Sequence, residues 1–175
     1  MKKILPLVFC FLLAACGFQL RGTAILPFDT IYIAAPAGHP LGTDIKRLIR
    51  GGSNARIVDK AKDAQAILEI ISVTNDRQIM SVSGGGRVRE FELRYRVSFR
   101  LTDAKGAELI PANEISLHRV LPYTDAQVVG KEGEEAMLVR EMQSDSAAQI
   151  MRRLSAVKAA GFYESPHQIA TTARL

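Results

Sequence analysis

The feature that most constrains the fold is a strict alternation of apolar and polar residues from position 91 to position 102. The apolar members are Phe91, Leu93, Tyr95, Val97, Phe99 and Leu101, and the polar members include Arg94, Arg96 and Arg100. Because successive side chains of a strand point to opposite faces, this segment predicts a long strand with one buried face and one wet, arginine-rich face. The fold must supply an apolar layer against the buried face.

Four further segments have the composition of strands, namely residues 30–35, 56–58, 66–73 and 115–121. Residues 66–73 are apolar at nearly every position, which predicts a central strand covered on both faces. A flexible tip is expected at residues 81–86, which end in three glycines, and a turn at residues 103–106.

Two segments have the period of an amphipathic helix. The first follows a turn-rich link at residues 38–42, is expected to be capped by Thr43 or Asp44, and ends at residues 51–52. The second runs from about residue 131 to residue 158, with glutamates in its first turns and basic residues near its end, as the helix dipole favours. Its apolar stripe consists of Val139, Met142, Ile150, Leu154 and Val157.

The order of these elements is β-α-β-β-β-α, with residues 56–58 as a short additional strand. It predicts an α+β fold in which two helices pack on one face of a mixed, mostly antiparallel four- to five-stranded sheet. Hydrophobic residues make up 47% of the chain and charged residues 23%, which is typical of globular proteins. Residues 16–162 are therefore expected to form a single domain, followed by a flexible C-terminal tail at residues 163–175.

The first fifteen residues have the pattern of a removable signal peptide. Lys2 and Lys3 precede an apolar run of twelve residues, shorter than the ~20 that a spanning helix needs. Residues 13–17 resemble the lipobox of bacterial lipoproteins, in which the signal is cut before a cysteine that is then acylated. The resemblance implies lipidation at Cys16, and Gly17 in place of an aspartate favours the periplasmic face of the outer membrane. The alternative is an ordinary secretory signal with an incidental Cys16.

Little in the sequence points to catalysis or to a cofactor. Cys10 leaves with the signal peptide, so the mature chain has one cysteine and cannot form an intramolecular disulfide or a multi-cysteine metal site. Neither a GxSxG elbow, nor HExxH, CxxC or GxxxxGK[ST] is present, and the three histidines are dispersed. The acidic cluster of Glu132, Glu134 and Glu135 is explained by the start of a helix. The chain is therefore predicted not to be an enzyme, although a triad assembled in space would escape this reasoning.

The charge balance argues against general nucleic-acid binding. The full chain has 23 basic and 18 acidic residues, a net charge of +5, and removal of Lys2 and Lys3 with the signal leaves +3. This charge is mild, so any anionic partner must be bound by a local basic patch.

Several segments together resemble the LptE family of lipopolysaccharide (LPS)-assembly lipoproteins. They are the start at residues 16–22 (CGFQLRG), the strand at 89–93 (REFEL), and residues 130–135, 139–142 and 150–154 near and within the last helix. The resemblance extends from Cys16 to about Ala160. It implies a non-catalytic subunit that sits as a plug inside the LptD β-barrel, assists the assembly of that barrel, and binds LPS during export to the outer leaflet.

The family resemblance also implies two basic contacts to LPS. Lys131 matches the lysine before the last helix, whereas the loop contact has no direct match, and Arg87 and Arg89 are the nearest bases. From the residues alone, we expect Arg87 and Arg89 to continue the wet face that carries Arg94 and Arg96. Arginine forks and lysine ammonium groups bind phosphates and carboxylates, so these four arginines and Lys131 are the candidate LPS-binding residues. The alternative for this face is a solvated polar surface.

Two other functions stay open from the sequence. One is an unrelated outer-membrane lipoprotein that acts as an interaction module for another envelope assembly machine or for the cell wall. The other is a periplasmic hydrolase. Co-purification with a very large β-barrel separates the family function from the first of these.

Overall fold

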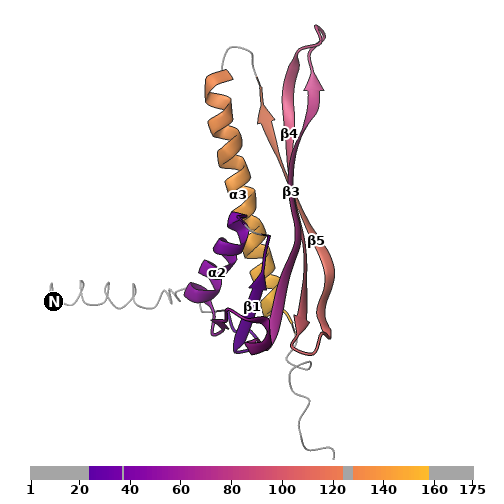
Figure 1. Ribbon diagram of the computed structural model, residues 1–175. Helices are drawn as coiled ribbons and strands as arrows, with labels where there is room; N and C mark the ends of the chain where they lie inside the picture. Colours follow the sequence, from indigo (N-terminus) through magenta and orange to yellow (C-terminus); the bar gives the residue numbers. More distant parts are fainter. Residues whose placement is uncertain (1–23, 37, 124–127, 158–175) are drawn as a thin grey trace, which may run out of the picture.

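The computed structural model describes residues 24–36, 38–123 and 128–157, and it arranges them in two layers. One layer is a five-stranded sheet and the other consists of two helices, α2 and α3, which lie on the same face of that sheet (Figure 1). The strands are β1 (Thr30–Ala34), β2 (Arg56–Ile57), β3 (Ala66–Val82), β4 (Val88–Asp103) and β5 (Glu108–Pro122). The helices are α2 (Pro40–Gly52) and α3 (Val128–Ser155), and a short 3-10 turn covers Ala61–Asp63. The predicted α+β class is confirmed.

The sheet is mixed, with the strand order β2-β1-β3-β4-β5. Strand β1 runs parallel to both of its neighbours, with Ile31 opposite Ala66 of β3. Strands β3, β4 and β5 form an antiparallel meander, with Phe99 of β4 between Ile70 and Asn113. The helix α2 connects β1 to β2, as parallel neighbours require, whereas the antiparallel strands are joined by tight turns.

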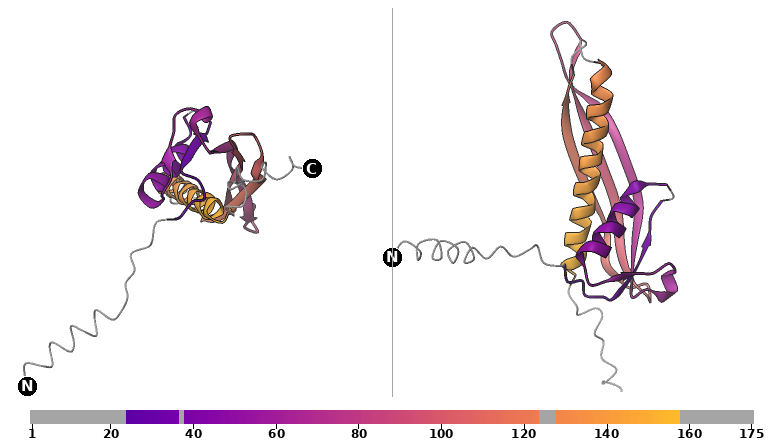
Figure 2. Two further views of the ribbon diagram at one scale, coloured as in Figure 1. Left: turned by 90° about the horizontal axis from the view of Figure 1, so that it is seen from below. Right: turned by 90° about the vertical axis from the view of Figure 1, so that its left-hand side faces the viewer.

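The predicted alternation of β4 is confirmed. Its odd-numbered residues from Leu93 to Leu101 are buried beneath the helices, and Phe99 is completely inaccessible. Opposite them, α3 contributes an apolar stripe in which Met142, Ile150 and Leu154 are fully buried. Figure 2 shows α3 running along almost the whole sheet, while α2 lies beside only its lower half. The lower half is therefore covered by two helices and the upper half by one.

The start of α2 differs from the sequence expectation. The N-cap is His39, whose Nδ1 accepts a hydrogen bond from the backbone N–H of Leu41 at 3.2 Å, and not Thr43 or Asp44. Pro40 occupies the first turn, where its fixed φ suits a helix and its missing N–H is not needed. With Pro40 in the first turn, the N-cap lies four or five residues before the expected Thr43 or Asp44. The end at Gly52 was predicted correctly.

Strand β3 is central, as predicted, but it is not covered on both faces. Ile71 is 46% exposed, because both helices lie on one face and nothing in the described part of the chain covers the other. The strand also continues to Val82, well beyond residue 73, and pairs with β4 along its whole length. The predicted flexible tip is therefore reduced to the four-residue turn Ser83–Gly86, in which Gly86 takes a φ of +76°.

A β-bulge in β3 changes which residues face the helices. Ile70 pairs with β4 and Ser72 pairs with the next position, so Ile71 is an extra residue. Before the bulge, the even-numbered Ile70 is buried; after it, the odd-numbered Arg77 lies directly opposite the buried Leu93. Paired residues share a face of the sheet, so the bulge directs Arg77 toward α3.

Candidate functional site

A cavity of about 410 Å³ opens at the upper end of the molecule, between the start of α3 and the strands that α2 does not reach. Its walls come from the ends of the paired strands β3, β4 and β5, from the residues next to them, and from α3. The lining residues are Arg77, Arg87, Val88, Phe91, Leu121, Tyr123, Lys131, Glu132 and Glu135. We call it the cationic cavity, because three of its residues are basic.

The floor of the cationic cavity is apolar and aromatic. Phe91 and Tyr123 meet edge to face, with ring centroids 5.3 Å apart and an interplanar angle of 81°. This is a favourable aromatic geometry that fixes both rings. Leu121, which is paired with Phe91 across the sheet, is buried and also lines the cavity. The cavity thus combines an apolar base with a charged rim.

Lys131 enters the cationic cavity from the first turns of α3. Its side chain is only 16% exposed, and its Nζ lies 2.7 Å from Oε2 of Glu134. Arg87 reaches the cavity from the other side, where the turn between β3 and β4 is closed by hydrogen bonds between Ser83 and Arg87. The structure therefore brings together two of the residues predicted from the sequence.

The other predicted bases do not share this surface. Arg94 and Arg96 project from the opposite face of β4, where both lie against Asp76: Arg96 Nη2 is 3.0 Å from Oδ1, and Arg94 Nε is 3.6 Å from Oδ2. Arg89 is exposed, and its odd position places it on the side of Phe91. The expectation of one continuous basic surface is wrong. Arg87 and Arg89 are odd-numbered and Arg94 and Arg96 even-numbered, so the two pairs lie on opposite faces of the sheet.

The outer face of the sheet, which turns away from the helices, is polar and internally neutralised. Besides the Asp76 cluster, it carries a pair between Arg100 and Glu69, whose Nη2 and Oε2 atoms are 2.7 Å apart. Such exposed pairs contribute little to stability. The arginines there already have carboxylate partners, so this face resembles a solvated polar surface more than a ready anion site.

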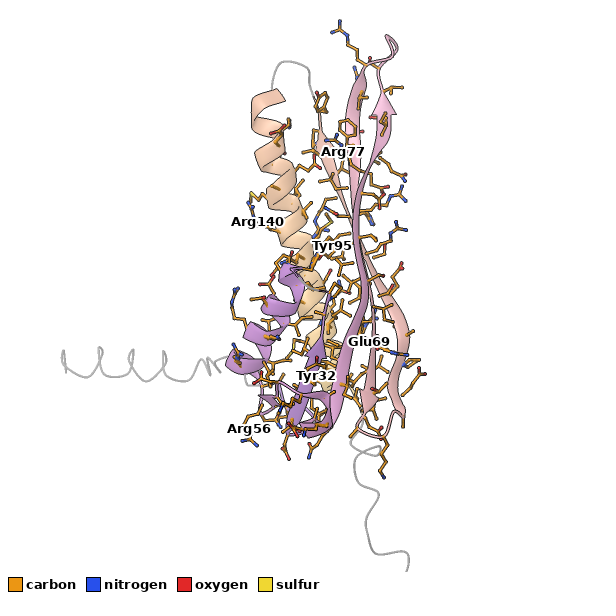
Figure 3. The ribbon with its side chains drawn as sticks, in the orientation of Figure 1. Tyr32, Arg56, Glu69, Arg77, Tyr95 and Arg140 are labelled. Atoms are coloured by element: carbon orange, nitrogen blue, oxygen red, sulfur yellow. The ribbon has the colours of Figure 1, made fainter. Side chains whose placement is uncertain are left out.

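Sequence reasoning missed Arg77. Its Nη1 lies 2.8 Å from Oε2 of Glu135, and its guanidinium carbon lies 4.6 Å from the centroid of the Phe91 ring. Figure 3 shows Arg77 between the upper strands and α3. Alternation counted forward from Ile70 would place residue 77 on the outer face. Only the bulge at Ile71 brings Arg77 inside, and no turn residue in the sequence marks that bulge.

A separate polar cluster lies where α2 meets α3. The Nε2 of the nearly buried Gln143 donates to Oδ2 of Asp44, and the Tyr95 hydroxyl is buried with no hydrogen-bond partner among the described residues. Burial raises the pKa of Tyr95 to about 12, and the Asp44 carboxylate adds to the shift. Neither group borders the cationic cavity, and the cluster offers no nucleophile with an adjacent base.

Other candidate sites are weaker. A groove of about 370 Å³ between the ends of α2 and α3 is lined mainly by small and apolar residues, with Arg152 as its one charged member among the described residues. In the part of the chain that the structure describes, no cluster of three His, Cys, Asp or Glu side chains could hold a metal ion. None of the helices described is both long and apolar enough to span a bilayer. Cys16 lies outside the described residues.

Comparisons with known proteins place the chain in a family and agree with the fold. Residues 28–154 match the family model for LptE, described as lipopolysaccharide-assembly. The LPS-assembly lipoprotein LptE of Yersinia enterocolitica is 30% identical over 152 residues, which are 84% of this chain and 72% of that protein. The same name is carried by relatives from Yersinia pestis and Yersinia pseudotuberculosis at the same identity.

Solved structures of two other lipoproteins have a similar fold. The solution structure of uncharacterized lipoprotein B from Nitrosomonas europaea is 48% identical, with a TM-score of 0.72 over 83% of this chain and 95% of that one. The rare lipoprotein B from Shewanella oneidensis has a TM-score of 0.67 at 22% identity, over 77% of this chain and all of that one. The second likeness shows the fold alone.

Proposed function

Because the chain belongs to the LptE lipopolysaccharide-assembly family, we propose that it binds LPS as the glycolipid is inserted into the outer leaflet of the outer membrane. In this proposal it also plugs the LptD β-barrel and helps that barrel to assemble. The observation that carries the binding proposal is the cationic cavity, in which Arg77, Arg87 and Lys131 converge above an aromatic floor. No step of this function requires a catalytic residue or a cofactor.

The chemistry of the cavity suits the headgroup of a phosphorylated glycolipid. Lipid A and the inner sugars carry phosphates and carboxylates, which arginine forks and lysine ammonium groups bind through charge-assisted hydrogen bonds. Next to the cavity, the end of β3 exposes three apolar side chains, those of Ile79, Met80 and Val82. An amphiphile could place its charged head in the cavity and its acyl chains along this hairpin.

The polar outer face of the sheet supports the plug proposal. The lumen of a large β-barrel is polar and hydrated, so a plug does not need an apolar docking patch. On the outer face, neutralised pairs such as Arg100 with Glu69 give a hydrophilic surface of that kind. We also propose that Cys16 is acylated after removal of residues 1–15, because several acyl chains together hold a protein stably at a membrane.

The binding proposal is tested with charge reversals of the two bases that the cavity brings together. LPS affinity of the full-length chain is measured for Lys131→Glu combined with Arg87→Glu, at two salt concentrations. We expect a loss of about tenfold or more, because each charged hydrogen bond is worth about 1.5–3 kcal/mol, and a weaker wild-type affinity at high salt.

The matched control is Arg140→Glu, which reverses one charge of α3 outside the cavity; Arg140 is exposed and lies on the side of α3 away from the sheet (Figure 3). All variants are compared by thermal unfolding. A cavity double variant that unfolds normally and binds LPS as well as Arg140→Glu would refute the assignment of the site.

A further inference from the structure

We propose that Arg77 and Glu135 form an exchangeable ion pair, in which a phosphate monoester of the bound glycolipid displaces the Glu135 carboxylate and is bound by Arg77. This inference rests on the proposed function, since it assigns a residue and a selection mechanism to the same cavity. Arg77 comes from the middle of β3 and not from the loop before β4, so it adds a basic group at a position that the family resemblance did not indicate.

The geometry of the pair fits an exchangeable contact. Among the described residues, the contact joins Nη1 of Arg77 to a single oxygen of Glu135, 2.8 Å away, which is not the parallel two-bond arrangement of the strongest arginine pairs. The two side chains are 49% and 32% exposed. Ion pairs with this exposure gain little net free energy in water. The carboxylate can therefore be replaced at small cost.

A second contact holds Arg77 in place when the carboxylate leaves. Its guanidinium lies over the face of Phe91, 4.6 Å from the ring centroid, and Phe91 is itself fixed against Tyr123. A cation–π contact orients the guanidinium plane without using its N–H donors. The arginine is thus positioned on the floor of the cavity, with its donors available to a planar pair of phosphate oxygens.

The charges around the cationic cavity explain why a carboxylate is paired with Arg77 when no ligand is bound. Three bases, Arg77, Arg87 and Lys131, lie beside three acids of α3, which are Glu132, Glu134 and Glu135. Without a ligand, the three carboxylates offset the mutual repulsion of the three bases. A doubly charged phosphate forms stronger contacts than a carboxylate and can displace it, whereas a weakly charged ligand cannot. The acids thereby select for phosphorylated glycolipids.

A purely structural role for the same pair makes a different prediction. If the pair only pinned the start of α3 to β3, then loss of either partner would loosen the cavity, and both substitutions would weaken binding together. Exchange predicts opposite effects. Without the carboxylate, Arg77 is available at once; without Arg77, the phosphate loses a bidentate partner.

The experiment measures the affinity of the full-length chain for LPS with Arg77→Gln, Arg77→Lys, Glu135→Gln and the double variant Arg77→Gln/Glu135→Gln. We expect Arg77→Gln to weaken binding about tenfold, as the loss of a charged bidentate contact implies. Arg77→Lys should recover part of that loss, because it keeps the charge without the fork. Glu135→Gln should tighten binding a few-fold, and the double variant should show no such gain over Arg77→Gln.

The controls remove the same groups elsewhere on the surface: Arg140→Gln for the arginine and Glu114→Gln for the glutamate, both exposed positions outside the cavity. A further arm repeats the titrations with LPS from which the lipid A phosphates have been removed, and another adds inorganic phosphate as a competitor. With the dephosphorylated lipid, Arg77→Gln and the wild-type chain should bind alike. Competition by inorganic phosphate at low millimolar concentration would mean that the cavity binds free phosphate and does not require the glycolipid.

The outcomes separate this inference from the proposed function. If Lys131→Glu weakens LPS binding but neither Arg77→Gln nor Glu135→Gln changes it, the exchange is overturned. The proposed LPS site in the cationic cavity is then still supported. A loss of affinity in both single variants supports the structural role and also overturns the exchange. No LPS binding by the wild-type chain overturns the proposed function itself.

Discussion

Tyr95 buries a polar group, its hydroxyl, in the hydrophobic core. Its hydroxyl has no hydrogen-bond partner among the described residues, although the side chain is 1% exposed. Burial favours the neutral phenol, which is why the pKa of Tyr95 rises to about 12 from its ordinary value of 10.0. The aromatic ring stabilises the core because it buries a large apolar surface, whereas the hydroxyl contributes no hydrogen bond to the described residues.

We therefore predict a stability difference between wild type and Tyr95→Phe that depends on pH. Because the pKa is higher in the folded state, the contribution of Tyr95 is complete below pH 10 and is lost as the pH rises toward 12. Near neutral pH, Tyr95→Phe should be as stable as wild type or slightly more stable. At about pH 11 the variant should be more stable by roughly 1–2 kcal/mol.

Urea unfolding of both proteins at several pH values measures this difference. The subtraction cancels the titration of every other group. A constant difference from pH 7 to pH 11 would mean that the phenol is hydrated in the folded protein.

Phe99 of β4 and Ile150 of α3 belong to the same core cluster, and both are completely buried. Their burial was predicted from the period of two in the strand and of 3.6 in the helix. Truncation leaves a cavity that the surrounding core fills only in part, so Phe99→Ala should cost about 3–5 kcal/mol of unfolding free energy and Ile150→Ala about 2–5 kcal/mol.

Denaturant midpoints of the two variants check these values. Leu48→Ala is the control, because Leu48 belongs to the apolar face of α2 but is 39% exposed, and its loss should cost under about 1 kcal/mol. Equal costs at all three positions would contradict the core described here.

At the scale of the elements, the sequence was informative where one period persists over many residues. The alternation of β4 and the stripe of α3 determined both elements to within a few residues at each end. The second half of β3 was missed because its residues are mostly polar and exposed, so neither face is marked by apolar side chains. That half is ordered by backbone pairing with β4, which a pattern of side chains does not reveal.

The candidate site was predictable only in part, for a related reason. Lys131 was found through a family match and Arg87 through its nearness to the loop, and the structure places both in one cavity. Arg77 required knowledge of a bulge, since one extra residue reverses the faces of everything that follows it. Arg94 and Arg96 are even-numbered, so they lie on the opposite face of β4 from Phe91 and outside the cavity. This could have been predicted from the alternation in the sequence alone.

For the whole molecule, we predict that anchoring and folding are separable. The core begins at Leu26, ten residues after Cys16, so Cys16→Ser should fold normally. Intact mass should show acyl chains on the wild type and none on the variant, and membrane fractionation should release only the variant. A wild-type chain without acyl mass contradicts the lipoprotein assignment.

The same pair of proteins tests the barrel partner. Wild type extracted in mild detergents should elute with a very large β-barrel in gel filtration, and detergent-solubilised Cys16→Ser should bind the same barrel when mixed with it. Crosslinkers placed at the exposed turn residue Lys105 should reach the barrel wall. Elution of the wild type alone under several detergents would favour an unrelated envelope partner.

The unequal cover of the sheet by its helices has a consequence for motion. The lower half of the sheet lies beside two helices, whereas the upper half, formed by β3, β4 and β5, lies beside α3 alone. Amide hydrogen exchange should therefore become faster along these strands toward the cationic cavity. The upper end could then open while the lower core stays closed. A ligand bound there would slow amide exchange in the β3–β4 hairpin far more than it raises the melting temperature. Hydrogen exchange in this hairpin is therefore a more sensitive measure of ligand binding than thermal unfolding.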